Sequence, residues 1–550
     1  MTWRSVAGSS AILLGLVACG GETTNEAQST KLLASTTAVA ATPAFGVTDS
    51  GGILTVSSGA GLVFKVGAGG SITSITYNGG PELQDQTKGS HINSGIGAAV
   101  SYTNDGSVIK ITLTTASLVH YLLVKQNDNT IYMGTYVTAE PTVGELRWIT
   151  RLKGTEFTSV PVESNNAGST GDIESSDVKG HADGTTTSKY YGNQRAKDLT
   201  IRGVTGSGVG AFMVYGNRET SSGGPFYRDI QNQSGGGVEV YNYMNSGHAQ
   251  TEAWRTGFFG PYALIFNDGS TAPAIPDMSW MGDYCLSGWV GASGRGQVSG
   301  TGLSGMDPNY SYTVGFANTT AQYWADVSPT GGFSAAGMKA GTYSMTVYKN
   351  ELAVYTEQVT VDAGATTTMN NRSITGDPST ASALWRIGDW DGTPLEFLNG
   401  TSFNVRHPSD VRNASWAVTG FNVGDPVNTF PAALWQNTVG NNPLTVTFNL
   451  TAAQVASHTV RIGITTANAG GRPKIVVNGW TSSIPAASSQ PSSRTLTVGT
   501  YRGNNKMFTY SVPASAFVAG TNTMTIYVSS GSSGTAFLSP SYSFDALDML

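Results

Sequence analysis

The chain has 550 residues, of which only 12% are charged and 70 are glycine, and its formal net charge is −6. A single hydrophobic core does not extend over so long a chain, so about three or four domains are expected. The small negative charge argues against nucleic acid or an anionic membrane surface as a partner. Two cysteines do not make a disulfide framework.

The N-terminal segment has the pattern of an export signal. Arg4 supplies a positive charge, and the apolar run 11–17 is far shorter than the roughly 20 residues that cross a bilayer. The segment closes on Leu-Val-Ala-Cys19, which resembles a bacterial lipoprotein signal and implies cleavage before Cys19 and lipidation of its thiol. The alternative is an ordinary secretory signal. We therefore expect 1–18 to be a signal peptide and the protein to be exported, either lipid-anchored to the bacterial cell envelope or secreted.

Residues 19–44 are rich in Thr, Ala and Ser and poor in aromatics, so they are expected to form a flexible tether. After them, short runs of Val, Ile, Thr and Tyr alternate with clusters of Gly, Asn, Ser and Thr. This alternation is typical of β-sandwiches joined by tight turns. Only 452–457 favours a helical turn, so the sequence predicts an all-β protein.

The longest β-rich block, 45–284, is predicted to form a large double-sheet sandwich. The polar turn 126–129 should join two of its strands into a hairpin. The strands expected in this block are 111–115, 119–124, 131–137, 211–215, 238–243 and 262–266.

Two smaller β-rich blocks follow. Residues 285–372 resemble a fibronectin-type-III-like domain, and their Gly-rich run 295–300 lacks the following helix that a phosphate-binding loop needs. Residues 377–550, which contain the run HPSDVR at 407–412, resemble a jelly-roll carbohydrate-binding-like domain with strands expected at 444–449, 459–465, 474–477 and 524–528. In such domains a calcium ion often joins the two sheets, and Asp545 or Asp548 could supply an oxygen ligand. No Asp-rich calcium loop is present, so structural calcium stays an open alternative.

Chemically active side chains gather in the first block. Tyr241 and Tyr243 are two apart in a predicted strand, so both rings project from one face of a sheet. His248 follows in a short Asn-Ser-Gly turn, and Lys189 lies upstream in a Thr-Thr-Ser-Lys run. Phenols, an imidazole and an amine, together with guanidiniums, are the groups that hold an acidic sugar and remove a proton from it. The alternatives are ordinary strand packing for the tyrosines and a surface position for the lysine.

Two arginines stand four apart in GELRWITRLK. In a strand, Arg147 and Arg151 emerge on the same face, where they suit a clamp that binds a carboxylate through paired hydrogen bonds. The alternative is that they form ion pairs with Glu145 or Glu156.

Four segments carry a family resemblance: SKYYGNQR (188–195), SSGGPFYRDI (221–230), YMNSGHAQTE (243–252) and GPYAL (260–264). Followed by the two smaller β-modules, they resemble the rhamnogalacturonan lyases of polysaccharide lyase family 4, over about 45–550. The resemblance implies a β-sandwich catalytic domain, a fibronectin-like domain and a jelly-roll domain. It also implies β-elimination in the rhamnose–galacturonic acid backbone of rhamnogalacturonan I, which leaves an unsaturated uronate at the new non-reducing end.

Elimination from a uronate removes the C5 proton and expels the glycosidic oxygen at C4. A cation on the carboxylate stabilises the developing enolate, and a base must reach C5. The resemblance implies that Lys189 is this base and that His248 assists by donating to the leaving oxygen or to the carboxylate. Since a free lysine has a pKa of about 10.4, we expect Arg147, Arg151 and partial burial to lower the pKa of Lys189. His181 is the alternative base.

Two other classes of function stay open. A glycoside hydrolase would draw a carboxylate pair from Asp229, Glu239 and Glu252. A non-catalytic surface lipoprotein would only bind polysaccharide through its β-modules. For the lyase, we expect no cofactor in catalysis, a monomer, and rhamnogalacturonan I as the partner, with membrane contact through the lipid anchor alone.

Overall fold

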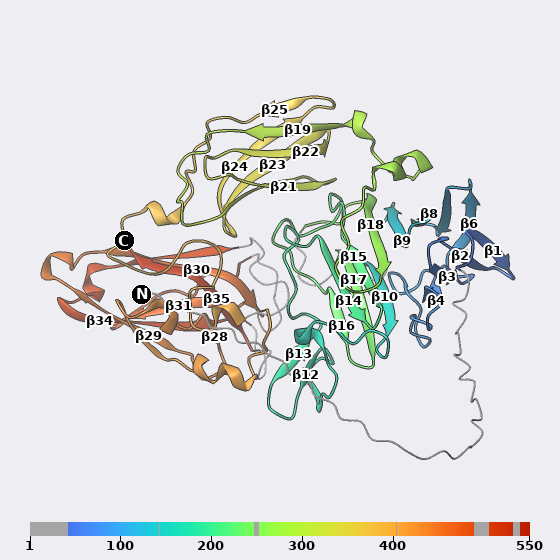
Figure 1. Ribbon diagram of the computed structural model, residues 1–550. Helices are drawn as coiled ribbons and strands as arrows, with labels where there is room; N and C mark the ends of the chain where they lie inside the picture. Colours follow the sequence, from blue (N-terminus) through green and yellow to red (C-terminus); the bar gives the residue numbers. More distant parts are fainter. Residues whose placement is uncertain (1–41, 142–143, 247–251, 403, 489–504, 532–538) are drawn as a thin grey trace, which may run out of the picture. The chain divides into compact units, whose positions relative to one another are not determined.

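The computed structural model describes residues 42–550, with the exception of 142–143, 247–251, 403, 489–504 and 532–538 (Figure 1). Thr42–Leu550 form one compact unit. The regular elements in this part of the chain are β-strands and short 3₁₀ helices, which confirms the all-β prediction. None of the helices described is long and apolar enough to cross a membrane.

A seven-stranded antiparallel sheet forms one layer of the first domain. Its strands lie in the order β14 (Ile201–Gly206), β15 (Val209–Val214), β18 (Gly257–Asn267), β9 (Thr130–Val137), β8 (Leu118–Lys125), β7 (Val108–Thr114) and β6 (Ala99–Asn104). Side chains alternate along each strand: Leu122 of β8 faces the main core, whereas Leu123 faces a second core under η2 (Ser279–Tyr284). Both faces of this sheet are therefore covered.

A four-stranded sheet packs on the main core from the other side. Its order is β16 (Asn232–Ser234), β17 (Gly237–Asn245), β10 (Leu146–Lys153) and β5 (His91–Ile92). Figure 1 shows β10, β16 and β17 as neighbouring strands. Trp148 of β10 and Val240 of β17 are fully buried in the core that the two sheets share. The predicted double-sheet sandwich is present.

Two smaller sheets complete this domain. One contains β1 (Gly46–Ser50), β2 (Ile53–Ser57), β3 (Leu62–Val66) and β4 (Ile72–Tyr77) in sequence order. The other contains β11 (Gly171–Glu174), β12 (Val178–Gly180) and β13 (Thr186–Ser188), and η1 (Val162–Ser164) precedes it. The second of these sheets ends directly before Lys189.

The second domain follows η3 (Ala292–Gly294) and is a sandwich of a three-stranded and a four-stranded sheet. The three-stranded sheet has β22 (Phe333–Lys339), β19 (Arg295–Gly300) and β25 (Thr366–Thr368), and the four-stranded sheet has β21 (Gln322–Asp326), β20 (Tyr312–Ala317), β23 (Gly341–Lys349) and β24 (Leu352–Val361). Buried Glu219 of the first domain joins the two domains, because Arg295 Nη1 and Nη2 donate to its carboxylate over 2.7 and 3.0 Å, and Lys339 Nζ lies 3.1 Å away.

The third domain packs two five-stranded sheets around one core. The first sheet contains β26 (Trp385–Gly388), β35 (Ser541–Met549), β30 (His458–Asn468), β33 (Lys506–Val512) and β28 (Ala433–Trp435); the second contains β27 (Gly420–Asn422), β29 (Leu444–Leu450), β34 (Gly520–Ser529), β31 (Arg472–Val477) and β32 (Trp480–Thr481). Its 3₁₀ helices are η4 (Pro378–Thr380), η5 (Gly400–Ser402), η6 (Val411–Trp416), η7 (Val427–Thr429), η8 (Ala452–Gln454) and η10 (Ala514–Ala516).

Local sequence rules explain the turns that were predicted. The run 126–129 connects β8 to β9, and Asn127 there takes a positive φ of 62°, which asparagine tolerates better than most residues. The helical turn expected at 452–457 is shorter, because η8 ends at Gln454 after a reciprocal cap between Thr451 and Gln454.

Candidate functional site

Strand pairing brings four of the predicted site residues to one place. In the antiparallel β10–β17 pair, Arg147 lies opposite Tyr243, and Ile149 lies opposite Tyr241. Val240 and Trp148 point into the core, so the odd-numbered residues of both strands point to the opposite face. The prediction that Arg147 and Arg151 share a face is confirmed, and the two tyrosines lie on that face with them.

Arg147 is held at the edge of this face by several groups. Its Nη1 donates to the Tyr243 hydroxyl over 2.9 Å, and the guanidinium lies 5.4 Å from the centre of the Tyr243 ring. Glu145 forms an ion pair with it, as the alternative reading of the sequence anticipated. Its Nε is buried and has no hydrogen-bond partner among the described residues.

Arg151 has a different set of partners. Its Nε donates to Glu239 over 2.8 Å, and its Nη1 lies 2.9 Å from His91 Nε2 and donates to the Gly89 carbonyl over 3.1 Å. Burial, with the charges of Arg151 and Arg147, lowers the pKa of His91 to about 4. His91 is therefore neutral at neutral pH and accepts the hydrogen bond from Arg151. Glu156 is not the partner of Arg151, contrary to the ion-pair alternative.

The rings of Tyr241 and Tyr243 stack on each other and pack with Tyr190. Their ring centroids lie 5.7 Å apart, and both rings belong to a buried cluster with Tyr190 and Ile149. The Tyr241 hydroxyl donates to Glu239. Burial raises the pKa of Tyr241 and of Tyr243, so both remain protonated phenols. These side chains are packed, yet their hydroxyl groups reach the arginine–glutamate network.

Lys189 directly follows β13 and precedes Tyr190, whose ring joins the tyrosine cluster. It is not the exposed loop lysine of the alternative reading, because its side chain is only 25% exposed and its neighbours Ser188 and Tyr190 are buried. Its Nζ lies 2.8 Å from Asp177. The charged partner that we expected, Arg147 or Arg151, is thus replaced by an acid on the β11–β12 hairpin. A lysine that acts as a base must leave this ion pair when it binds substrate.

Two predicted residues, His248 and Cys19, lie outside the described residues. β17, the last described strand before His248, ends at Asn245. His181, the alternative base, is bonded to Thr187, its Nε2 lying 2.9 Å from that hydroxyl.

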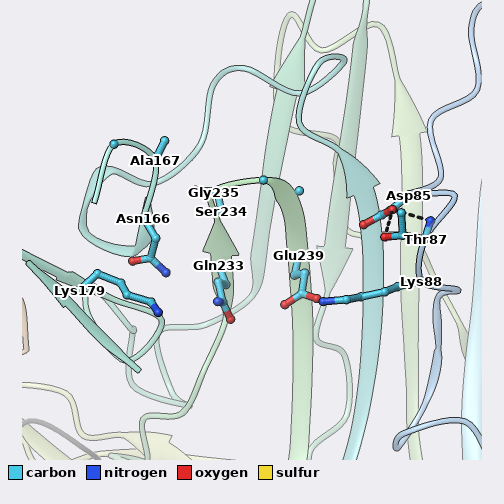
Figure 2. Close-up of a pocket in the computed structure, with 13 residues that line it drawn as sticks. Asp85, Thr87, Lys88, Asn166, Ala167, Lys179, Gln233, Ser234, Gly235 and Glu239 are labelled. Atoms are coloured by element: carbon cyan, nitrogen blue, oxygen red, sulfur yellow. Dashed lines mark hydrogen bonds between the residues drawn. The ribbon is translucent and has the colours of Figure 1, made fainter. Parts of the chain in front are cut away.

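A polar cavity of about 740 Å³ adjoins the Arg151–Glu239 pair. Figure 2 shows Lys88 and Lys179 on opposite sides of it, with Gln233 and Glu239 between them. Asn166 and the glycine turn 235–237 complete part of its wall. Amides, lysines and carboxylates are groups that hydrogen-bond sugar hydroxyls, and the volume is that of a small-molecule site.

The three carboxylates of the hydrolase alternative are already engaged. Asp229 accepts from the Tyr227 hydroxyl and from the Ile230 backbone over 2.7 Å. Glu239 is held by Arg151 and Tyr241. Glu252 accepts from the Gly223 backbone and lies 3.6 Å from Arg255. All three carboxylates are therefore held by other groups of the protein, whereas hydrolysis needs one carboxyl group as the acid and a second as the base or nucleophile.

The structure gives the two candidate calcium ligands other partners. Asp548 accepts hydrogen bonds from Arg461, Arg386 and the Trp390 indole over 2.6–3.1 Å, so its negative charge is neutralised inside the protein. Asp545 Oδ1 accepts from the backbone of Gly392 over 2.6 Å. No group of three or more His, Cys, Asp or Glu suited to a metal ion occurs within the described ranges.

Asp545 instead belongs to a buried acidic cluster with Asp391 and Glu396. Burial and the neighbouring carboxylates raise the pKa of Asp545 and of Asp391, and they raise the pKa of Glu396 to about 9. Because like charges close together cannot all ionise, the cluster keeps protons at neutral pH. Asp545 Oδ2 is buried without a hydrogen-bond partner among the described residues, so a calcium ion at Asp545 stays a prediction.

Sequence reasoning did not find His91 or Asp177, and it considered Glu239 only as a hydrolase carboxylate. His91 lies far from Arg151 in the chain, and only the pairing of β5 with β10 brings them together. Glu239 could have been found, because it shares the two-residue period of Tyr241 and Tyr243 on the same predicted strand.

The chain is similar to known proteins over most of its length. Residues 45–288 match a family model described as rhamnogalacturonan lyase B, N-terminal; residues 294–369 and 383–549 match domains II and III of polysaccharide lyase family 4. The chain is 43% identical over 512 residues to the probable rhamnogalacturonate lyase A of Aspergillus terreus, covering 91% of this chain and 94% of that protein. It is 42% identical over 524 residues to the rhamnogalacturonate lyase A of Aspergillus aculeatus, covering 93% and 97%.

The acidic cluster of the third domain makes stability depend on pH. The folded state holds the Glu396 proton up to about pH 9, whereas the unfolded chain releases it near 4.5. Stability from this group is complete below about pH 4.5 and is lost as the pH rises to about 9, by at most about 1.4 kcal/mol per pH unit. The melting temperature of Glu396→Gln should therefore fall less than that of the wild type between pH 5 and pH 9. The exposed Glu140→Gln variant is the control, and an unchanged slope in Glu396→Gln would contradict the assignment.

Proposed function

The chain belongs to the rhamnogalacturonan lyases of polysaccharide lyase family 4, and on this premise we propose that it cleaves the rhamnogalacturonan backbone at the face of the β10–β17 pair that carries Arg147 and Arg151. The observation that carries the proposal is the set of two arginines and two tyrosines that the strand register places on one face. A galacturonate residue offers a carboxylate to the guanidiniums and hydroxyls to the phenols.

The arginines stabilise the transition state. As the C5 proton leaves, negative charge moves onto the uronate carboxylate, and a guanidinium that already binds it holds the resulting enolate more tightly. Arg147 offers its guanidinium, which the Tyr243 hydroxyl orients. Arg151 is fixed in direction by Glu239 and neutral His91, so it need not reorganise during the reaction.

Lys189 is the base in this proposal and His248 assists the departure of the C4 oxygen. Lys189 is half-buried beside Tyr190, which packs with Tyr241 and Tyr243, so its amine lies next to the face that binds the uronate. Lys189 leaves Asp177 and gives its ammonium proton to solvent, and the neutral amine then takes the C5 proton. The C4–O bond breaks as the C4=C5 double bond forms, and His248 donates a proton to the leaving oxygen.

The polymer extends along the sheet beyond the reacting sugar. Glu239 faces both Arg151 and the polar cavity, so a backbone sugar bound at Arg151 has its neighbour at Lys88, Lys179 and Gln233. The hydrolase alternative is set aside, because the two Aspergillus relatives described above are named lyases and the three carboxylates considered are engaged by other groups.

Export is part of the same proposal. The signal in 1–18 ends directly before Cys19, and the tether 19–44 would separate a lipid anchor from the catalytic domain. Extracellular pectin is too large to enter a cell, so a lyase on the envelope or outside it meets its substrate. We propose that a monomer acts there.

Removing the base should remove activity. Lys189→Ala should lower the formation of unsaturated uronate, followed by ultraviolet absorbance, by about 10² to 10⁴-fold, and His248→Ala should do the same. The wild-type rate should rise towards alkaline pH, because the base acts only after losing its proton. Lys197→Ala, which removes another lysine paired with an aspartate but outside the site, is the control. Near-normal turnover in a correctly folded Lys189→Ala variant would move the base elsewhere.

Turnover should not depend on a metal ion. Lysine, arginine and histidine supply the base and the charge stabilisation in this proposal, so a chelator should leave the rate within about twofold of the untreated enzyme. Melting temperature measured in parallel reports any structural ion. Loss of activity that added calcium restores would mean that a cation, rather than the arginines, carries the uronate charge.

The anchor can be tested at Cys19. Cys19→Ala should move the protein from the membrane fraction to a soluble exported fraction, or leave it unprocessed. Mass spectrometry of the wild-type N-terminus should show more than one acyl chain, because a single chain binds membranes only reversibly. A Cys19→Ala variant that stays with the membrane would exclude lipidation as the anchor.

A further inference from the structure

The run HPSDVR of the third domain contacts the strand that leads into Lys189. Asp410 Oδ2 accepts two hydrogen bonds from Thr186, one from the backbone N–H and one from the hydroxyl, each over 2.9 Å. The backbone N–H of His407 donates to the same hydroxyl over 3.2 Å. Thr186 lies three residues before Lys189, so the third domain holds the start of the lysine segment.

The third domain also contacts the chain after Lys189, through residues close to HPSDVR. Gly192, three residues after Lys189, donates its backbone N–H to the Asn404 carbonyl over 2.6 Å. Val411 donates its own backbone N–H to the Gly184 carbonyl over 3.1 Å. The lysine is thus bracketed by bonds to residues more than two hundred positions away.

The partner of Lys189 is held as well. Asp177 lies in the β11–β12 hairpin, and Glu174 at the end of β11 is bonded to His407, whose Nε2 lies 2.9 Å from Glu174 Oε2. His407 is fully buried, and its Nδ1 lies 2.7 Å from the Ser409 hydroxyl. Both members of the Lys189–Asp177 pair therefore belong to a small sheet that the third domain fastens.

Asp410, which accepts the hydrogen bonds from Thr186, is itself held in place by Arg412. The Asp410 side chain is fully buried, and its two oxygens accept from Arg412 Nε over 2.7 Å and Arg412 Nη2 over 2.6 Å. A buried carboxylate that receives four or more hydrogen bonds has one well-defined position. It is a rigid anchor, whereas the three-stranded sheet it holds is too small to be stable alone.

We propose that Asp410 and His407 are positioning residues for elimination, and that the third domain acts in catalysis by placing Lys189 as well as through any sugar it binds. This rests on the proposed role of Lys189 as the base. A base displaced by about 1 Å can lose about 10²-fold in rate, although substrate contacts elsewhere are unchanged. The arginines and tyrosines lie on β10 and β17, so loss of Asp410 should spare substrate binding.

The test replaces both ends of the central hydrogen bonds in the full-length protein. Asp410→Asn should lower kcat at least tenfold on rhamnogalacturonan, with KM within about threefold of the wild type. Thr186→Val, which loses the hydroxyl, should also lower kcat, and Thr186→Ser, which keeps it, should restore most of the rate. In the Thr186→Val background, Asp410→Asn should add less than its effect alone, because both act through one contact.

Asp425→Asn is the matched control, since Asp425 is an exposed acid of the same domain that accepts from Asn422 of its own loop. A kcat of Asp410→Asn within twofold of the wild type, or equal losses in Thr186→Ser and Thr186→Val, would overturn the proposal. If Asp410→Asn does not fold, the threonine pair decides alone. Lys189→Ala, assayed beside them, separates the two hypotheses: an active Lys189→Ala removes the base assignment, whereas an inactive one with an active Asp410→Asn removes only the positioning role.

Discussion

The register between β10 and β17 is the constraint on which the candidate site depends. Residues of a strand alternate between its faces, so a shift of one position would move Arg147 and Arg151 into the core and Trp148 to the surface. The burial of Trp148 and Val240 in the sandwich therefore fixes the register, and the register places Tyr243 against Arg147 and Glu239 against Arg151. The apolar side of the pair determines the geometry of its polar side.

Every charge on that polar side has a partner that limits its movement. Glu239 joins Arg151 to Tyr241, and neutral His91 accepts from Arg151 without adding a second positive charge. A half-buried arginine without such partners would be costly to desolvate and free to rotate. Binding a uronate then replaces few bonds and orders few side chains, which leaves more of the binding energy for the transition state.

How much the sequence predicted depended on the range of the interactions. The strands, the 126–129 turn and the shared face of Arg147 and Arg151 follow from periods of two residues and from turn chemistry, which are local, and the structure confirmed them. Partial burial of Lys189 was expected with Arg147 and Arg151 as its charged neighbours, because nothing near it in the chain indicates that Asp177 lies beside it. Asp548 was predicted as a possible calcium ligand, and nothing near it in the chain indicates that Arg461, on another strand, donates to it.

The arrangement of the domains explains how the small β11–β13 sheet can hold Lys189 in a defined position. Three strands of three or four residues cannot bury enough apolar surface to hold a charged lysine in one place. Inserting Lys189 into the sandwich itself would solve this, but the desolvation would be costly and the polymer could not reach the amine. Backbone groups and one buried carboxylate of a distant domain hold this sheet and so limit the position of the lysine, whose side chain stays 25% exposed. A chain that folds as one unit of three domains can combine these two requirements.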